Sequence, residues 1–120
     1  MNRTEPIKDA MPNPPQLNLQ EMQAAAAQAC ALLKVLSNPD RLMLLCQLTQ
    51  GEYCVSELES MLGIAQPTLS QQLGVLREER LVGTRREGKQ IFYRIDSTAA
   101  LALMDVLYQQ FCMPSKGVQP

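Results

Sequence analysis

The chain has 120 residues, a net charge of −1 and a hydrophobic fraction of 46%, which predict one globular domain with a modest core. No apolar run approaches the ~18 residues of a membrane span, and the first residues lack the apolar core of a signal peptide. We therefore expect a cytoplasmic protein without a membrane partner. In that compartment the four cysteines are expected to rest as thiols, either reactive, metal-binding or simply buried.

The charges are unevenly distributed along the chain. Residues 1–60 contain four basic and seven acidic side chains, whereas residues 61–94 contain six basic and three acidic ones, a local net charge of +3. A local positive field attracts nucleic acid even when the whole chain is slightly acidic. The charge pattern therefore favours a nucleic-acid contact within residues 61–94.

The N-terminal third is predicted to hold a disordered arm and a long helix. Residues 1–17 are polar and rich in proline, and Asn18 can cap a helix with Glu21 at the capping-box position. Apolar residues then recur at steps of three and four: Leu19, Met22, Ala26, Ala29, Leu33 and Leu36. This seam is equally typical of ordinary core packing and of a dimer contact.

Three further helices and a hairpin are expected next. Asn38 and Pro39 begin a second helix, and Ser56 with Glu59 resembles a capping-box pair for a third, which ends at Gly63. A fourth helix is predicted from about Pro67 to Arg80. Strands at roughly 82–86 and 90–95 surround a turn at Gly88.

A last helix completes the predicted domain. Asp96 or Ser97 is expected to cap it, and Pro114 ends it after about Met113. The order is a mainly α fold with a small β-wing, which is typical of a winged helix-turn-helix. The domain is predicted to span residues 18–113, followed by a flexible tail at 114–120.

The fourth helix has a polar face suited to reading DNA. Leu69, Leu73 and Leu76 fall on one side and are expected to face the core. Amides and hydroxyls can hydrogen-bond base edges, although a merely soluble polar face remains the alternative. The residues of this set are Gln66, which we expect as an unusual cap at the helix entrance, Thr68, Ser70, Gln71 and Gln72.

The hairpin carries a second group of DNA-binding candidates. Apolar and polar residues alternate along 90–95, as expected of a strand with one buried face. Around its Gly88 turn lie Arg85, Arg86, Lys89 and Gln90. These side chains can reach phosphates or a neighbouring minor groove, which predicts an affinity for DNA that falls steeply with salt.

Three segments resemble the ArsR/SmtB family of winged-helix repressors. They are LSNPDRLMLL, GIAQPTLSQQLGVLRE and LVGTRREGKQIFYRI, and the resemblance runs from about Leu33 to Cys112. It implies a homodimer joined by the first and last helices. It also implies binding to an AT-rich, imperfect inverted repeat of double-stranded DNA, with repression until an inducer acts.

The metal-sensing members of the family offer one set of inducers. Their last-helix zinc site requires histidine, but this chain has none, and its last helix offers only the Asp105 carboxylate. In the third-helix thiolate motif, GEYCVSEL places Cys54 at the first cysteine position and Ser56 at the second. Soft metals favour several sulfur ligands, so no metal or cofactor is expected. A soft-metal response through Cys54 stays open as an alternative.

The remaining cysteines resemble those of one branch of the family. Cys46 in LMLLCQL and Cys112 in YQQFCMP, with SQQLGVLRE and KQIFYR, resemble the biofilm growth-associated and sulfide-responsive repressors. That resemblance implies a repressor that releases its operator when reactive sulfur species or related oxidants join Cys46 and Cys112 in a disulfide or polysulfide. Any free cysteine can instead simply pack, as we expect of Cys30, and Cys54 is an alternative reactive thiol.

Other function classes are less well supported by the sequence. An enzyme is not expected, because histidine, a CxxC pair and a phosphate-binding glycine loop are all absent. A winged helix that binds protein instead of DNA, and an activator or anti-repressor with the same fold, remain alternatives.

Overall fold

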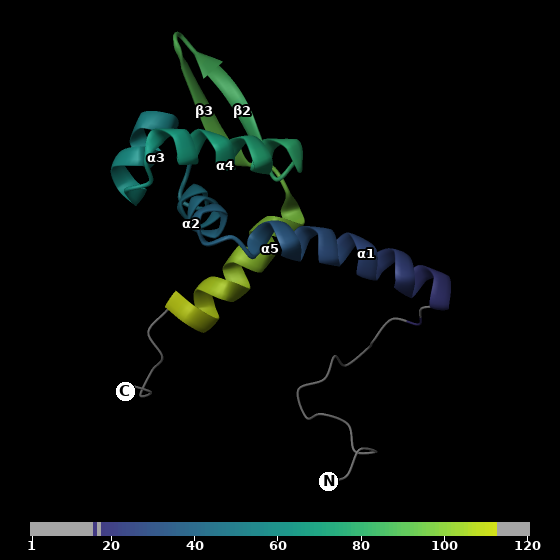
Figure 1. The fold of residues 1–120 in the computed structure, drawn as a ribbon. Coiled ribbons are helices and arrows are strands. Elements are labelled where there is room, and N and C mark those ends of the chain that lie inside the picture. The colour runs from purple at the N-terminus through teal and green to yellow at the C-terminus, as the bar shows by residue number, and fades with distance from the viewer. Residues whose placement is uncertain (1–15, 17, 113–120) are drawn as a thin grey trace, which may run out of the picture. The chain divides into compact units, whose positions relative to one another are not determined.

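The computed structural model describes residue 16 and residues 18–112. The predicted arm (apart from Gln16), Met113 and the tail therefore lie outside the described residues. The structure confirms a mainly helical winged helix-turn-helix with a three-stranded antiparallel sheet (Figure 1). The elements are α1 (Leu19–Leu36), α2 (Pro39–Leu48), β1 (Tyr53–Cys54), α3 (Val55–Leu62), α4 (Gln66–Glu78), β2 (Val82–Glu87), β3 (Gln90–Ile95), α5 (Thr98–Leu107) and a π-helical turn, η1 (Tyr108–Cys112).

Helix α1 spans the boundary between two units of the chain, one ending at Cys30 and the other beginning at Ala31. In the first unit, the Glu21 amide donates to Asn18 Oδ1 at 2.7 Å and the Asn18 amide donates to Glu21 Oε1 at 3.3 Å. This reciprocal pair confirms the predicted capping box. In the second unit, the last turn of α1 contributes Val35 and Leu36 to the core.

The core of the second unit is built mainly from leucines at helical spacing. Leu69, Leu73 and Leu76 of α4 are fully buried, as the i, i+4, i+7 pattern predicts. They pack in one cluster with buried residues of α2, α3 and α5: Leu44, Leu45, Leu48, Leu58, Ala100 and Met104. Burying one such leucine contributes about 1.5–3 kcal/mol, so this cluster supplies most of the domain's hydrophobic stabilisation.

Helices α2 and α3 begin differently from one another. Asn38 caps α2 as predicted, with its Oδ1 accepting from the Arg41 amide at 3.0 Å. For α3 the predicted Ser56–Glu59 pair is wrong, because the N-cap is Cys54 and Glu57 Oε1 accepts the Cys54 amide proton at 3.0 Å. Strand β1 fixes the chain as far as Cys54, so the helix begins at Val55.

Helix α4 begins one residue earlier than expected and ends two residues earlier. Ala65 is its N-cap, so the expectation that Gln66 caps this helix is wrong and Gln66 is the first helical residue. At the other end Arg80 has a φ of 64°, a left-handed conformation that cannot continue the helix. The turn is closed by the Leu81 amide, which donates to the Leu76 carbonyl at 2.9 Å.

The sheet consists of the predicted hairpin and one additional strand. Strands β2 and β3 pair from Val82↔Ile95 to Glu87↔Gln90, and Gly88 takes a φ of 64° in the turn. The short β1 pairs with the other edge of β3, through Tyr53↔Tyr93 and Cys54↔Phe92. The strand order β1-β3-β2 therefore joins the base of the wing to the start of α3.

Helix α5 follows the wing directly. Ser97, one of the two predicted caps, accepts the Ala100 amide proton on its Oγ at 3.1 Å. The helix continues into η1, which ends at Cys112 within the described residues. No helix in the described part of the chain combines the length and apolarity that crossing a membrane requires.

Candidate DNA interface and thiol site

The polar face of α4 is open to solvent. Gln66, Ser70 and Gln71 are exposed, whereas Thr68 is half-buried. Gly74 is also exposed, and a Cβ added there would meet nothing within 4 Å. Because the leucines hold the opposite side in the core, this face can approach an extended partner closely. The wing begins shortly after the end of α4 (Figure 1).

Gln72 is placed differently from the other four α4 candidates. It is half-buried, and its Oε1 accepts a hydrogen bond from Arg41 Nη1 of α2 at 2.8 Å. Its amide oxygen is therefore engaged within the domain. The sequence places Gln72 at the boundary of the polar face but gives no signal of Arg41 as its partner.

Arg85 of β2 is held by several neighbours on the wing. Its Nε lies 2.6 Å from Glu52 Oε1, its Nη1 lies 3.3 Å from Glu87 Oε1, and its guanidinium carbon lies 4.7 Å from the centre of the Phe92 ring. The hydrogen bond to Glu52 raises the pKa of Arg85 above its ordinary value. Arg85 is thus paired with Glu52 and Glu87, although its side chain stays 45% exposed.

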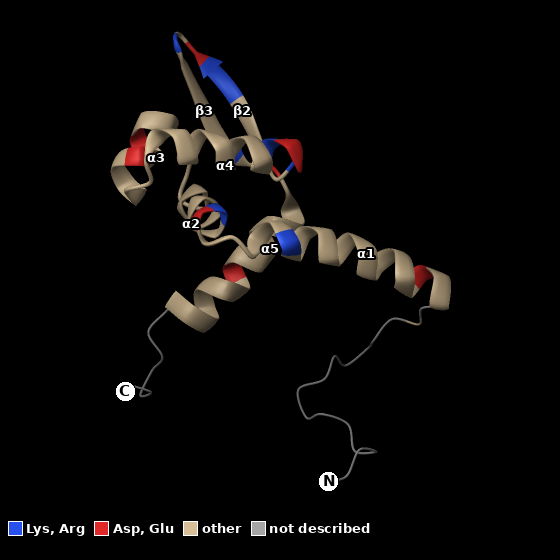
Figure 2. Ribbon diagram, in the orientation of Figure 1, with Lys and Arg blue, Asp and Glu red and all other residues tan. Residues whose placement is uncertain are grey.

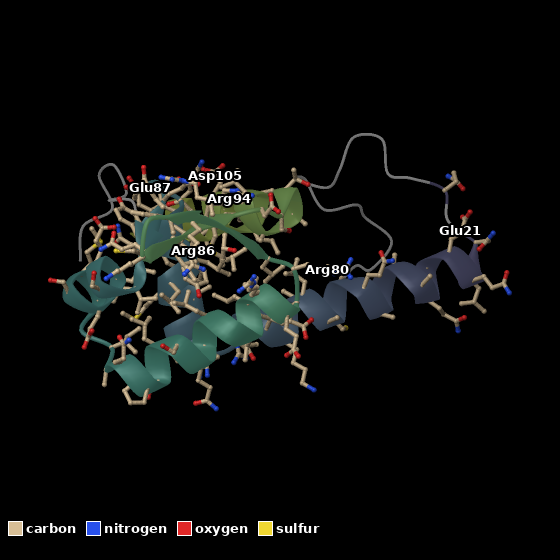
Figure 3. The ribbon with its side chains drawn as sticks, turned by 90° about the horizontal axis from the view of Figure 1, so that it is seen from above. Glu21, Arg80, Arg86, Glu87, Arg94 and Asp105 are labelled. Atoms are coloured by element: carbon tan, nitrogen blue, oxygen red, sulfur yellow. The ribbon has the colours of Figure 1, made fainter. Side chains whose placement is uncertain are left out.

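The other wing candidates lie nearer the turn. Arg86, Lys89 and Gln90 are exposed, and Arg86 Nε donates to the Gly88 carbonyl at 3.3 Å. Figure 2 shows basic residues along β2 and at the turn. Arg86 and Glu87 of β2 are labelled in Figure 3. Arg86 and Lys89 therefore present exposed positive charge beside the Gly88 turn.

Glu52, the residue before β1, contacts the wing in a way that the sequence did not reveal. Besides Arg85 it contacts Arg94 of β3, with Nη1 and Oε2 3.9 Å apart. Gly83 leaves room for this arginine, because a Cβ there would lie 2.9 Å from Arg94 Nη2. The partners are far apart in sequence and meet only when β1, β2 and β3 pair, so no local pattern signals them.

The structure brings Cys46 and Cys112 together. Cys46 is half-buried on α2, and Cys112 is exposed at the end of η1. Burial raises the pKa of the Cys46 thiol, and the neighbouring Cys112 thiol raises it further by its charge and by a hydrogen bond. Both thiols border an apolar cavity of about 320 Å³ lined also by Leu42, Met104, Leu107, Tyr108 and Phe111.

A second cavity borders Cys46 from another side. Its volume is about 610 Å³, and Met104 and Tyr108 line this cavity as well as the smaller one. The remaining lining residues are Thr49, Gln50, Thr98, Leu101, Ala102 and Asp105. Cys46 thus has open space beside it although its side chain is half-buried.

The other two cysteines lie in separate places. Cys54 is buried at the start of α3, with its Sγ 3.3 Å from Ser56 Oγ. Cys30 is exposed on α1, so the expectation that it simply packs is wrong for the single chain. Within the described residues no three His, Cys, Asp or Glu side chains gather closely enough to hold a metal ion.

Comparison with known proteins places the chain in one family. The model for "Bacterial regulatory protein, arsR family" matches residues 38–84. A biofilm growth-associated repressor of Agrobacterium fabrum is 52% identical over 103 residues, which cover 86% of this chain and 88% of that protein.

Solved structures agree with the sequence match. The crystal structure of the transcriptional repressor BigR from Xylella fastidiosa has a TM-score of 0.74 and 52% identity, covering 82% of this chain and 100% of that one. Reduced HlyU from Vibrio cholerae has a TM-score of 0.76 and 42% identity, covering 79% of this chain and 100% of that one. The chain therefore belongs to the ArsR family of bacterial regulatory proteins.

Proposed function

We propose that this protein is a dimeric DNA-binding transcriptional repressor that releases its operator when Cys46 and Cys112 are oxidised to a disulfide or polysulfide. The observation that carries the proposal is the meeting of these two thiols at one cavity between α2 and η1. Two thiols in one site are the minimum for a reversible link, because one attacks the oxidant and the other resolves the product.

The DNA-binding part of the proposal rests on α4 and the wing. Hydroxyl and amide groups on the polar face of α4 suit major-groove base edges, with Gln66, Thr68, Ser70 and Gln71 as the proposed readers. Arg86, Lys89 and Gln90 are proposed to contact phosphate or the adjacent minor groove, with Arg85 shaping the wing beside them. The proposed operator is an AT-rich, imperfect inverted repeat.

The dimeric part rests on apolar residues that a single chain leaves exposed. On α1, Leu19 is 69% exposed, Met22 53% and Leu33 55%. On α5, Leu101 and Val106 are also exposed. Exposed large apolar residues of this kind are typical of an interaction site, and a second copy of α1 and α5 would bury them.

The chemistry of the switch can be written as two exchange steps. The exposed Cys112 thiolate attacks the outer sulfur of an organic persulfide, RS–SH, which forms Cys112–S–SH and displaces RS⁻. The Cys46 thiolate then attacks the Cys112 sulfur, which forms the Cys46–Cys112 disulfide and releases HS⁻. If a second persulfide first converts Cys46 to Cys46–S–SH, condensation of the two persulfides gives a trisulfide and H₂S.

The link would act on the reader through α2. Cys46 lies on α2, and α2 packs against α4 in the shared core. A covalent bond from α2 to η1 changes the relative free energies of two arrangements of these elements. We propose that the linked arrangement places the two α4 helices of the dimer at a separation that no longer matches the operator.

The test compares DNA affinity under separate treatments. The parent protein, Cys46→Ser and Cys112→Ser are treated with glutathione persulfide, peroxide or arsenite, and binding to an operator selected from a random duplex library is measured. We expect persulfide to weaken binding by the parent while both variants stay bound. Full release from both serine variants would contradict the dithiol mechanism, and arsenite release that depends on Cys54 would favour a metal response.

A further inference from the structure

Arg41 joins three elements of the second unit. Its backbone amide lies in the Asn38 cap of α2, and its side chain makes two further hydrogen bonds. Nε donates to the Val35 carbonyl in the last turn of α1 at 2.8 Å, and Nη1 donates to Gln72 Oε1 on α4 at 2.8 Å. One side chain therefore spans the end of α1 and the middle of α4.

The chemistry of these contacts makes the geometry specific. The last carbonyls of a helix lack partners within the helix, so Val35 supplies a free acceptor where Arg41 can use it. A guanidinium only donates, which fixes the Gln72 amide with its oxygen towards Arg41. Both bonds are partly buried, so breaking one leaves polar groups poorly solvated.

We propose that Arg41 is a positioning residue that sets the orientation of α4 relative to the last turn of α1. We call the connection from α1 through Arg41 and Gln72 to α4 the brace, and we propose that Gln72 belongs to it instead of reading bases. The inference rests on the proposed function, in which α4 reads DNA within a dimer joined partly through α1. It adds two residues that act on recognition without touching DNA.

The brace has a consequence that ordinary core packing does not predict. In a two-fold dimer, the separation of the two recognition helices must match the separation of the two half-sites. If α1 joins the subunits, the α1–Arg41–Gln72–α4 connection helps to fix that separation. Loosening it should let the dimer tolerate operators of altered spacing, whereas removing a base-reading side chain weakens binding to every spacing alike.

Substitutions at Gln72 distinguish a role in the brace from a direct contact between Gln72 and DNA. Gln72→Glu retains an oxygen acceptor for Arg41 but removes the amide donor, whereas Gln72→Leu removes both. The negative charge added by Gln72→Glu weakens binding to all duplexes alike. The ratio of the affinities for two half-site spacings is unaffected by this uniform loss. Arg41→Gln breaks the connection from the other side.

The experiment uses the full-length, reduced dimer and the inverted repeat that the parent selects from a random duplex library. Dissociation constants are measured for this repeat and for versions with one base pair inserted into or removed from the spacer. Thermal melts of every variant check that it is folded. We expect the parent to prefer the selected spacing by about tenfold or more, which corresponds to ~1.4 kcal/mol.

We expect Arg41→Gln and Gln72→Leu each to lose most of this preference. The double variant should lose no more of it than either single variant. Gln72→Glu should keep the preference. Parental preference in both Arg41→Gln and Gln72→Leu would overturn the inference. So would a loss of affinity in Gln72→Leu with the spacing preference unchanged, because Gln72 would then bind DNA directly. A parent that binds no inverted repeat overturns the proposed function as well.

Discussion

Arg85 Nε and Glu52 Oε1 lie 2.6 Å apart and connect strand β2 of the wing to the residue before β1. This pair divides the basic residues of the wing into two kinds. Arg85 shares its charge with Glu52 and Glu87, while Arg86 and Lys89 remain exposed near the turn. The two kinds should respond differently when DNA binding is measured against salt.

Arg86→Ala and Lys89→Ala are each expected to lower the magnitude of the salt dependence, the slope of log K against log salt, by about 1.8, because the dimer carries each substitution twice and neutralises two phosphates fewer. Arg85→Ala should change that slope less, because Arg85 is already paired with Glu52. Fluorescence anisotropy of a labelled operator at several salt concentrations measures all three slopes. An Arg85 effect as large as that of Arg86 would show that the Glu52 pair opens on DNA.

The core offers a matched pair of neighbouring residues on α2. Leu44 is fully buried, whereas Met43 is 42% exposed. We expect Leu44→Ala to lower the free energy of unfolding by about 2–5 kcal/mol, because it leaves a cavity, and Met43→Ala to lower it far less. Urea denaturation at one fixed protein concentration measures both, since the stability of a dimer depends on concentration. Equal losses would contradict the described position of α2.

The raised pKa of the Cys46 thiol predicts how its reactivity depends on pH. Burial is the main cause and Cys112 contributes further, so alkylation of Cys46 in Cys112→Ser should be slow at neutral pH and accelerate with increasing pH. Iodoacetamide labelling followed by peptide mass spectrometry gives the rate. The half-titration pH should be higher in the parent with Cys112 present than in Cys112→Ser; an identical value would contradict the contact between the two thiols.

The same shift predicts an effect of pH on stability. The folded state holds the Cys46 proton more tightly than the unfolded chain, in which the thiol has its ordinary pKa of 9.0. The contribution is therefore fully present below that pKa and is lost as the pH rises through the higher pKa of the folded state. Cys46→Ser should flatten the decline of the free energy of unfolding above about pH 9, as measured by urea denaturation across that range.

The elements that sequence predicted correctly are governed by local chemistry. The leucine spacing of α4, the Asn18 and Asn38 caps and the Gly63 and Gly88 turns each depend on residues a few positions apart. Cys54 as the cap of α3 was missed because it depends on β1 pairing with β3, whose partners follow much later in the chain.

The site shows the same division between local and distant contacts. The helical spacing of the leucines predicts the polar face of α4. The Arg41–Gln72 and Glu52–Arg85 contacts, in contrast, join residues far apart in sequence. The proximity of Cys46 and Cys112 likewise depends on how α5 and η1 pack near α2. Resemblance to a family pointed to this pair, whereas periodicity and spacing alone did not.

The most direct test of the account follows the thiol link and the DNA in one sample. The reduced parent is bound to labelled operator and treated with glutathione persulfide; anisotropy reports release while digests of quenched aliquots are mapped by mass spectrometry. We predict that a Cys46–Cys112 disulfide or polysulfide appears at the same rate as release, and that dithiothreitol reverses both. Release without that link, or complete formation of the link on protein that stays bound, would contradict the account.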